Sequence, residues 1–137
     1  MKVYLDIDGT LIHEDLTENY GKPAAGLEDF ILALQTHELY WLTTHCREGD
    51  PTRAQEIVKR VTSPDIHRLI DDIKGTVWDV NKTEGIDWDY DLIWFDNEIF
   101  PEERARFDSV ELDQQFIEVD LRSNPNQLVE ITRDILI

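Results

Sequence analysis

The residues with the clearest chemical potential lie at the N-terminus. An apolar run at 3–5 leads directly into Asp6, and a second aspartate, Asp8, follows two residues later. Such a run predicts a buried strand, and ligands of open α/β sheets collect at the carboxyl ends of buried strands. A buried, unpaired carboxylate is costly, so Asp6 requires a cation or a proton-binding neighbour. The pair predicts a reactive site; the plainer alternative is a strand that ends in a turn.

The next residues complete a recognisable string, Asp6-x-Asp8-Gly9-Thr10, with Leu11 after it. This string resembles the first motif of the haloacid dehalogenase superfamily of phosphotransferases. The resemblance implies that Asp6 is the nucleophile that takes up a phosphoryl group. It implies that Asp8 is the general acid and base, and that Gly9 and Thr10 contact the substrate.

Polar residues also follow two later apolar runs. Thr43 and Thr44 follow the run at 39–42, and Asp96 follows the run at 90–95. The carboxyl ends of parallel strands share one edge of a sheet, so we expect these side chains to gather beside the two N-terminal aspartates.

The resemblance gives each later motif a residue. It implies that Thr43 donates a hydrogen bond to a phosphoryl oxygen, that Lys82 is the third-motif lysine and that Asp96 is the fourth-motif acid. Lys74 is the alternative lysine, and Lys82 is preferred because an apolar position, Ile86, follows it shortly before the fourth-motif strand. The plainer alternatives are a strand-ending threonine, a surface lysine and a turn aspartate.

A carboxylate nucleophile and a phosphate dianion repel each other, so the chemistry requires a hard divalent cation. Mg²⁺ prefers oxygen ligands, with one or two carboxylates beside substrate and water. We therefore expect Mg²⁺ to be held by Asp6, Asp96 and the main-chain carbonyl of Asp8. The chain departs from the family pattern after the fourth-motif acid, where Asn97 and Glu98 stand and many members have a further aspartate.

Two residues near Thr43 are outside this mechanism. We expect His45, together with Thr44, to contact the substrate; local hydrogen bonding of His45 is the alternative. Cys46 is the only cysteine, which excludes an internal disulfide and a cysteine metal cluster. A nucleophilic role for Cys46 is disfavoured because adjacent side chains at a strand end point apart.

The alternation of strand and helix patterns predicts an α/β chain, with a three-layer Rossmann-like fold and a mainly parallel sheet. The 137 residues suit one domain, 1–137. The stretches at 9–42 and 44–81 must already supply helices and strands, so no room remains for a domain-sized cap. Residues 63–79 fit neither period. We expect helices at 23–36, 50–62, 101–107 and from 124 or 125 onward, and a further strand at 116–119.

The formal net charge is −17, from 30 acidic and 13 basic residues. This charge disfavours a tight grip on a nucleic-acid backbone. The chain shows no bilayer-spanning stretch and no secretory leader, which predicts a cytoplasmic protein without a membrane partner.

The sequence thus predicts a Mg²⁺-dependent phosphatase that hydrolyses a phosphomonoester. Without a cap the site is open, which suits a large phosphorylated substrate. The strings at 41–44 and 93–96 are similar to a compact, capless branch of the superfamily that includes domains of RNA-repair proteins, which implies a nucleic-acid end that the charge does not favour. The alternatives are a non-catalytic family member that binds a metal or a partner, and an acidic interaction protein.

Overall fold

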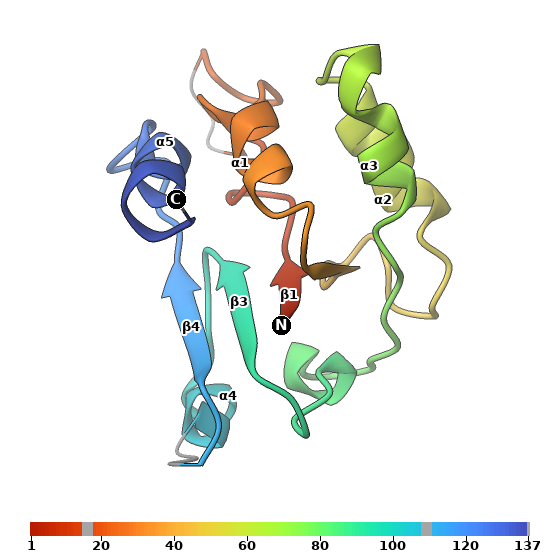
Figure 1. Cartoon of the computed structure of the whole chain (residues 1–137), viewed down its shortest axis with the longest axis vertical. Helices are drawn as coiled ribbons and strands as arrows, with labels where there is room; N and C mark the ends of the chain where they lie inside the picture. Colours follow the sequence, from red (N-terminus) through yellow and green to blue (C-terminus); the bar gives the residue numbers. More distant parts are fainter. Residues whose placement is uncertain (15–17, 108–110, 137) are drawn as a thin grey trace.

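A four-stranded parallel sheet lies at the centre of the computed structural model, which describes residues 1–14, 18–107 and 111–136. The strand order is β2-β1-β3-β4, and every neighbouring pair is parallel (Figure 1). The predicted α/β class with a parallel central sheet is confirmed. The strands are β1 Lys2–Leu5, β2 Glu38–Trp41, β3 Leu92–Asp96 and β4 Gln114–Glu118.

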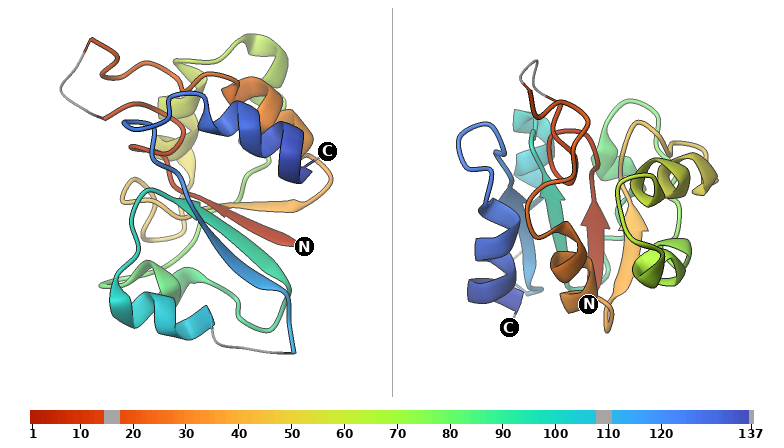
Figure 2. Two further views of the ribbon diagram at one scale, coloured as in Figure 1. Left: turned by 90° about the vertical axis from the view of Figure 1, so that its left-hand side faces the viewer. Right: turned by 90° about the horizontal axis from the view of Figure 1, so that it is seen from above.

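Short helices cover both faces of the sheet and give three layers. Figure 2 shows α1, α5, α2 and α3 on one face, and α4 with the short 3-10 turn η2 on the other. The helices are α1 Leu27–Ala33, α2 Thr52–Lys59, α3 His67–Asp71, α4 Pro101–Arg104 and α5 Gln127–Ile131, and the shorter turns are η1 Pro64–Ile66, η2 Lys82–Gly85, η3 Ala105–Phe107 and η4 Thr132–Leu136.

The sheet is buried on both faces because each strand sends alternate side chains into two separate cores. Val3 and Leu5 pack into the core beneath α1 and α5, whereas Tyr4 packs into the core on the side of α4. In β3, Phe95 meets α1 through an edge-on contact with Phe30, with ring centroids 5.1 Å apart. A strand covered on both sides reads as a continuous apolar run, which is why β1 and β3 were visible in the sequence.

The chain reverses its direction of winding between β1 and β3. The connection through α1 places β2 on one side of β1, and the next connection places β3 on the other. The N–H of Asp6 donates to the carbonyl of Phe95 (3.1 Å), so Asp6 lies beside the end of β3. In open α/β sheets this switch point is where ligands bind.

The described parts of the β1–β2 and β2–β3 connections contain loops, α1, α2, α3 and short turns, with no domain-sized insertion. None of the helices among residues 1–14, 18–107 and 111–136 has the length and apolar character needed to cross a membrane.

Several element boundaries differ from the predicted ones. The first helix begins at Leu27 because Gly26 adopts a left-handed conformation (φ 76°) that ends the preceding turn. Residues 63–79 fit neither period because they form two short helical pieces and then two isolated β-bridges, Lys74 with Tyr40 and Val77 with Glu48. The second predicted helix begins at Thr52, whose N–H donates to Asp50 Oδ1 (3.0 Å).

Candidate functional site

Three predicted site residues meet at the switch point. Lys82 Nζ lies 3.0 Å from Asp6 Oδ1 and 2.7 Å from Asp96 Oδ2. Asp6 is 4% exposed and Asp96 is fully buried. We call Asp6, Lys82 and Asp96 the buried triad. Its members come from the end of β1, the turn η2 and the end of β3, so the fold brings together residues that are distant in sequence.

Further hydrogen bonds fix the orientation of both carboxylates. Thr10 Oγ1 donates to Asp6 Oδ2 (3.0 Å), so each oxygen of Asp6 has a partner. The N–H of Glu98 donates to Asp96 Oδ1 (3.1 Å). Thr10 is fully buried. Its contact in the structure is therefore with Asp6, and its contact with a substrate stays a prediction.

The triad holds two carboxylates and one ammonium group, which leaves one negative charge in excess. The pKa of Asp6 is raised to about 7, first by burial and then by the nearby charge of Asp96, while Lys82 and Thr10 act to lower it. Burial also raises the pKa of Asp96. Burial acts to lower the pKa of Lys82, but the charges of Asp6 and Asp96 outweigh it and raise that pKa. The excess negative charge of the buried triad is therefore unfavourable, and a further cation would neutralise it.

Asp6 and Asp96 offer oxygen donors of the kind that Mg²⁺ prefers, and in the structure both carboxylates are paired with Lys82. Hard carboxylate oxygens of Asp6 and Asp96 converge, and Mg²⁺ commonly takes one or two carboxylates and keeps several waters. Among the described residues, no group of three or more His, Cys, Asp or Glu side chains converges to form a protein-only metal cage. The binding of Mg²⁺ by Asp6, Asp96 and the main-chain carbonyl of Asp8 therefore stays a prediction.

Asp8 and His45 form a second pair next to the buried triad. Asp8 Oδ2 lies 2.7 Å from His45 Nε2, and their side chains are 43% and 21% exposed. The fully buried Thr43 supports this pair, because its Oγ1 accepts the N–H of His45 (3.3 Å). We call Asp8 and His45 the open pair. The contact that His45 makes is with Asp8, and its contact with a substrate stays a prediction, as does the phosphoryl hydrogen bond of Thr43.

Two neighbours of the open pair have different surroundings. Thr44 is exposed and lines a hollow of about 530 Å³ together with His45 and Trp78. Cys46 is buried, and its thiol points to the carbonyl of Thr76 (3.8 Å). The cysteine is therefore part of the packing below the loop.

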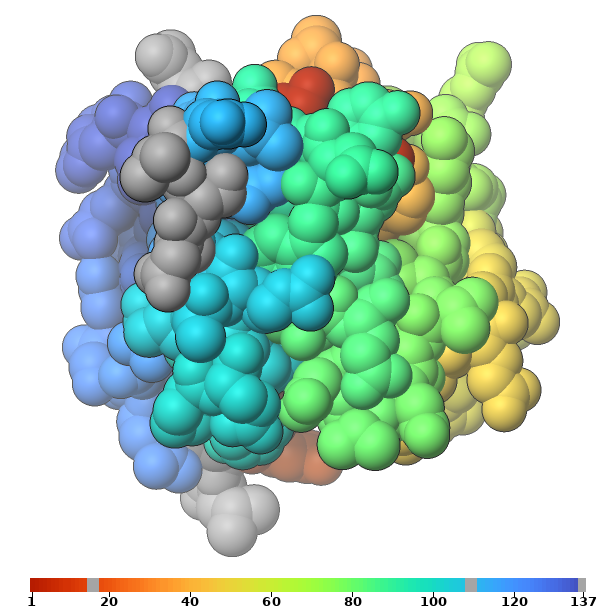
Figure 3. Space-filling view, turned by 90° about the horizontal axis from the view of Figure 1, so that it is seen from below, coloured from red at the N-terminus to blue at the C-terminus, as the bar shows by residue number. Residues whose placement is uncertain are grey.

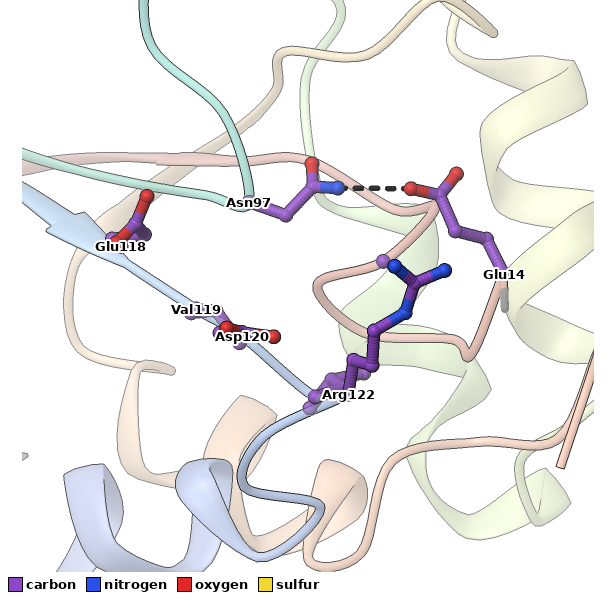
Figure 4. Close-up of a pocket in the computed structure, with 8 residues that line it drawn as sticks. Glu14, Asn97, Glu118, Val119, Asp120 and Arg122 are labelled. Carbon is purple, nitrogen blue, oxygen red and sulfur yellow. Dashed lines mark hydrogen bonds between the residues drawn. The ribbon is translucent and has the colours of Figure 1, made fainter. Parts of the chain in front are cut away.

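Gly9 lies where only glycine fits. Its φ is +80°, and a Cβ there would collide with the side-chain amide of Asn97 and lie 2.7 Å from Glu14 Oε1. Asn97 Nδ2 donates to that Glu14 oxygen (2.9 Å), which ties the loop after β1 to the end of β3. Figure 4 shows this bond, with Arg122 extending toward it across a hollow of about 300 Å³. The Gly9 N–H donates within its own loop, to Ile12 (2.7 Å), and a substrate contact of Gly9 stays a prediction.

The turn that carries Lys82 is held by an acid that the sequence reasoning missed. Glu103 is 3% exposed, and its two oxygens accept the N–H groups of Thr83 (3.3 Å) and Phe100 (3.2 Å). Figure 3 shows the face where residues of α4 (cyan) lie beside the segment around η2 (green). The one available signal was Pro101 with Glu103 three residues after Phe100, a helix-start pattern.

The alternative lysine lies elsewhere. Lys74 is exposed and its Nζ is 3.6 Å from Glu38 Oε1, at the other end of β2. The preference for Lys82 over Lys74 therefore agrees with the geometry.

Comparison with known proteins gave no match among protein-family models, curated proteins or solved structures. The function is accordingly inferred from the residues and geometry of this chain.

Proposed function

We propose that this protein is a Mg²⁺-dependent phosphatase that hydrolyses a phosphomonoester through an aspartyl-phosphate on Asp6. The supporting observation is the position of Lys82 Nζ between the buried carboxylates of Asp6 and Asp96. The half-exposed Asp8 follows Asp6 by two residues.

A structural role alone is a weak explanation for the buried triad. Replacing a buried ion pair by apolar residues of similar volume is often neutral or stabilising. A buried ion pair therefore contributes little to the free energy of unfolding compared with apolar packing. Strongly shifted carboxyl pKa values at a strand-end crevice are typical of reactive sites. The shifted pKa of Asp6 at the switch point therefore supports a chemical role.

In the first step an Asp6 oxygen attacks phosphorus and the bond from phosphorus to the alcohol oxygen breaks. Asp8, protonated at this stage, gives its proton to the leaving alcohol. Asp8 is suited to this task because it is half-exposed and lies two residues from the nucleophile.

In the second step Asp8 takes a proton from water as the water oxygen attacks phosphorus. The bond between phosphorus and Asp6 breaks, which releases inorganic phosphate and restores the carboxylate. Lys82 neutralises part of the negative charge throughout, and Thr10 keeps the Asp6 carboxylate from rotating. Mg²⁺, which Asp6 and Asp96 would hold, would supply the remaining positive charge beside the phosphate.

A panel of phosphomonoesters, assayed with and without Mg²⁺, tests the proposal. We expect turnover by the wild type with Mg²⁺ and loss of turnover in both Asp6→Asn and Asp8→Asn. Equal rates in all three proteins would overturn it. Absence of turnover with retained Mg²⁺ binding would favour a non-catalytic metal-binding protein, and tight binding of a basic protein that survives both substitutions would favour an acidic interaction protein.

A further inference from the structure

A third hollow, of about 460 Å³, opens beside the open pair. Asp8 and His45 line it, together with Ile57, Arg60 and Val61 of the α2 region. Its volume falls within the range of pockets that hold small molecules, roughly 300–1,000 Å³. We call it the α2 hollow.

We propose that the α2 hollow binds the alcohol part of the substrate, and that the substrate is a small monophosphate ester whose alcohol carries an apolar or ring-shaped group. This inference rests on the proposed phosphatase function. It narrows the substrate from any phosphorylated molecule to one whose leaving group fits this hollow, in place of the large substrate that the absence of a cap suggested.

The position of Asp8 selects the hollow. A general acid must come within hydrogen-bond reach of the leaving oxygen, so the group attached to that oxygen must lie beside Asp8. Asp8 itself lines the α2 hollow. The hollow that contains Thr44 and Trp78 is lined by His45 but not by Asp8.

The hollow of about 300 Å³ beside Gly9 has the wrong charge for a phosphate ester. Its described lining holds three acids, Glu14, Glu118 and Asp120, and one basic residue, Arg122. An anionic ester would be repelled there more than in the α2 hollow, whose described lining holds two acids, Asp8 and Glu14.

The walls of the α2 hollow indicate the leaving group. Ile12, Ile57 and Val61 present hydrocarbon, and Tyr20 adds an exposed aromatic ring. Burying apolar surface of a ligand against such walls is favourable, at about 25 cal/mol per Å². Arg60 is the only Lys or Arg among the described lining residues, and the net charge of the chain is −17, so a second phosphate would meet little positive charge. A compact monophosphate suits the hollow better than a polynucleotide end.

Two substrates with matched chemistry separate the contribution of the hollow from that of the phosphoryl site. Ethyl phosphate and cyclohexylmethyl phosphate release primary alcohols of similar acidity, and they differ in apolar bulk. With Mg²⁺ present, we expect kcat/KM to be about 10- to 100-fold higher for cyclohexylmethyl phosphate, as a few extra buried methylene groups provide.

The substitution Ile57→Asp should remove most of that preference, measured as the ratio of the two kcat/KM values within the variant. The ratio of the two values in one protein does not depend on the folded fraction, so partial unfolding cannot imitate the effect. Ile57→Ala serves if Ile57→Asp does not fold. Val80→Asp, at a 73% exposed valine outside the hollow, is the matched control and should keep the wild-type ratio.

Binding supplies a second readout. Cyclohexylmethyl phosphonate should bind the wild type more tightly than ethyl phosphonate, and Ile57→Asp should remove the difference. Turnover of both esters at equal kcat/KM, or a preference that Ile57→Asp leaves intact, would overturn the inference and leave the phosphatase function standing. Absence of turnover of either ester, and of the wider phosphomonoester panel, would overturn both.

Discussion

Asp6 and Asp8 are two residues apart, yet they lie in opposite environments. Asp6 is 4% exposed and shares Lys82 with Asp96, whereas the Asp8 side chain is 43% exposed and pairs with His45. The buried triad is fixed from three elements of the fold, and the open pair lies at the edge of a hollow. This difference matches the two roles proposed for these residues. A nucleophile at Asp6 would be held in place and partly neutralised, and an acid and base at Asp8 would stay close to solvent, where protons exchange.

The largest expected effect comes from breaking the triad at the nucleophile. Asp6→Asn should lower kcat by about 10⁴-fold or more, because an amide does not form the acyl-phosphate bond. The fold should persist, since the amide carries no buried charge. Steady-state kinetics and a urea midpoint measure the two effects, and a kcat within about tenfold of the wild type would contradict the proposed role.

Removing the shared ammonium group should have the largest effect on folding. Lys82→Met leaves two buried carboxylates without their cation and should lower the free energy of unfolding by about 3–5 kcal/mol. Lys74→Met is the control; this lysine is exposed, so its loss should stay within about 0.5 kcal/mol. Chemical denaturation of both variants would show equal losses if the triad were unimportant for the fold.

A substitution in the open pair should lower kcat but change the free energy of unfolding little. Asp8→Asn should lower kcat by about 10²- to 10⁴-fold, the usual contribution of a general acid and base. Because the side chain is half-exposed, the free energy of unfolding should change by no more than about 1 kcal/mol. A large loss of stability with little loss of kcat in Asp8→Asn would contradict the proposed difference between Asp8 and Asp6.

The pH dependence of the free energy of unfolding tests the buried environment of Asp6 without any substrate. The folded-state pKa of Asp6 is raised to about 7 from its ordinary 3.8, chiefly by burial, so folding favours the protonated form. The resulting stability is fully present below about pH 4 and is lost as the pH rises through about 7. Metal-free wild type should therefore lose stability relative to Asp6→Asn between pH 4 and 8. Parallel denaturation curves over this range would show that the pKa is not raised.

The smallest expected effect is the coupling within the open pair. A double-mutant cycle of Asp8→Asn and His45→Ala should give a coupling energy in folding of about 0–1 kcal/mol, as for exposed ion pairs. The corresponding cycle of Asp6 and Lys82 should give a clearly larger value. Similar values in the two cycles would remove the distinction between the two regions.

The sequence revealed the parts of the site that follow from the sheet. The apolar runs before Asp6 and Asp96 predicted buried strands, and parallel strands bring their carboxyl ends to one edge. The triad was predictable for that reason, with the motif resemblance identifying Lys82. The class of the fold followed from the same alternation of strands and helices.

The remaining features depend on tertiary contacts that a single sequence does not encode locally. The pairing of His45 with Asp8 is set by the loop after β2, and the buried Glu103 is satisfied by the N–H of Thr83 from another element. The late start of α1 depends on Gly26, which has a left-handed conformation. A Cβ atom at position 26 would collide with the side chain of Val129 in α5. Each of these is decided by neighbours that are distant in sequence.

Covalent trapping tests the central role of Asp6 most directly. The protein is mixed with Mg²⁺ and a ³²P-labelled phosphomonoester, quenched in acid within a single turnover and digested, and the labelled peptide is sequenced. We predict that the label is on Asp6, that hydroxylamine releases it, that it accumulates in Asp8→Asn and that it is absent from Asp6→Asn. Hydrolysis of the ester by the wild type with no labelled protein at any time in the turnover would contradict the account.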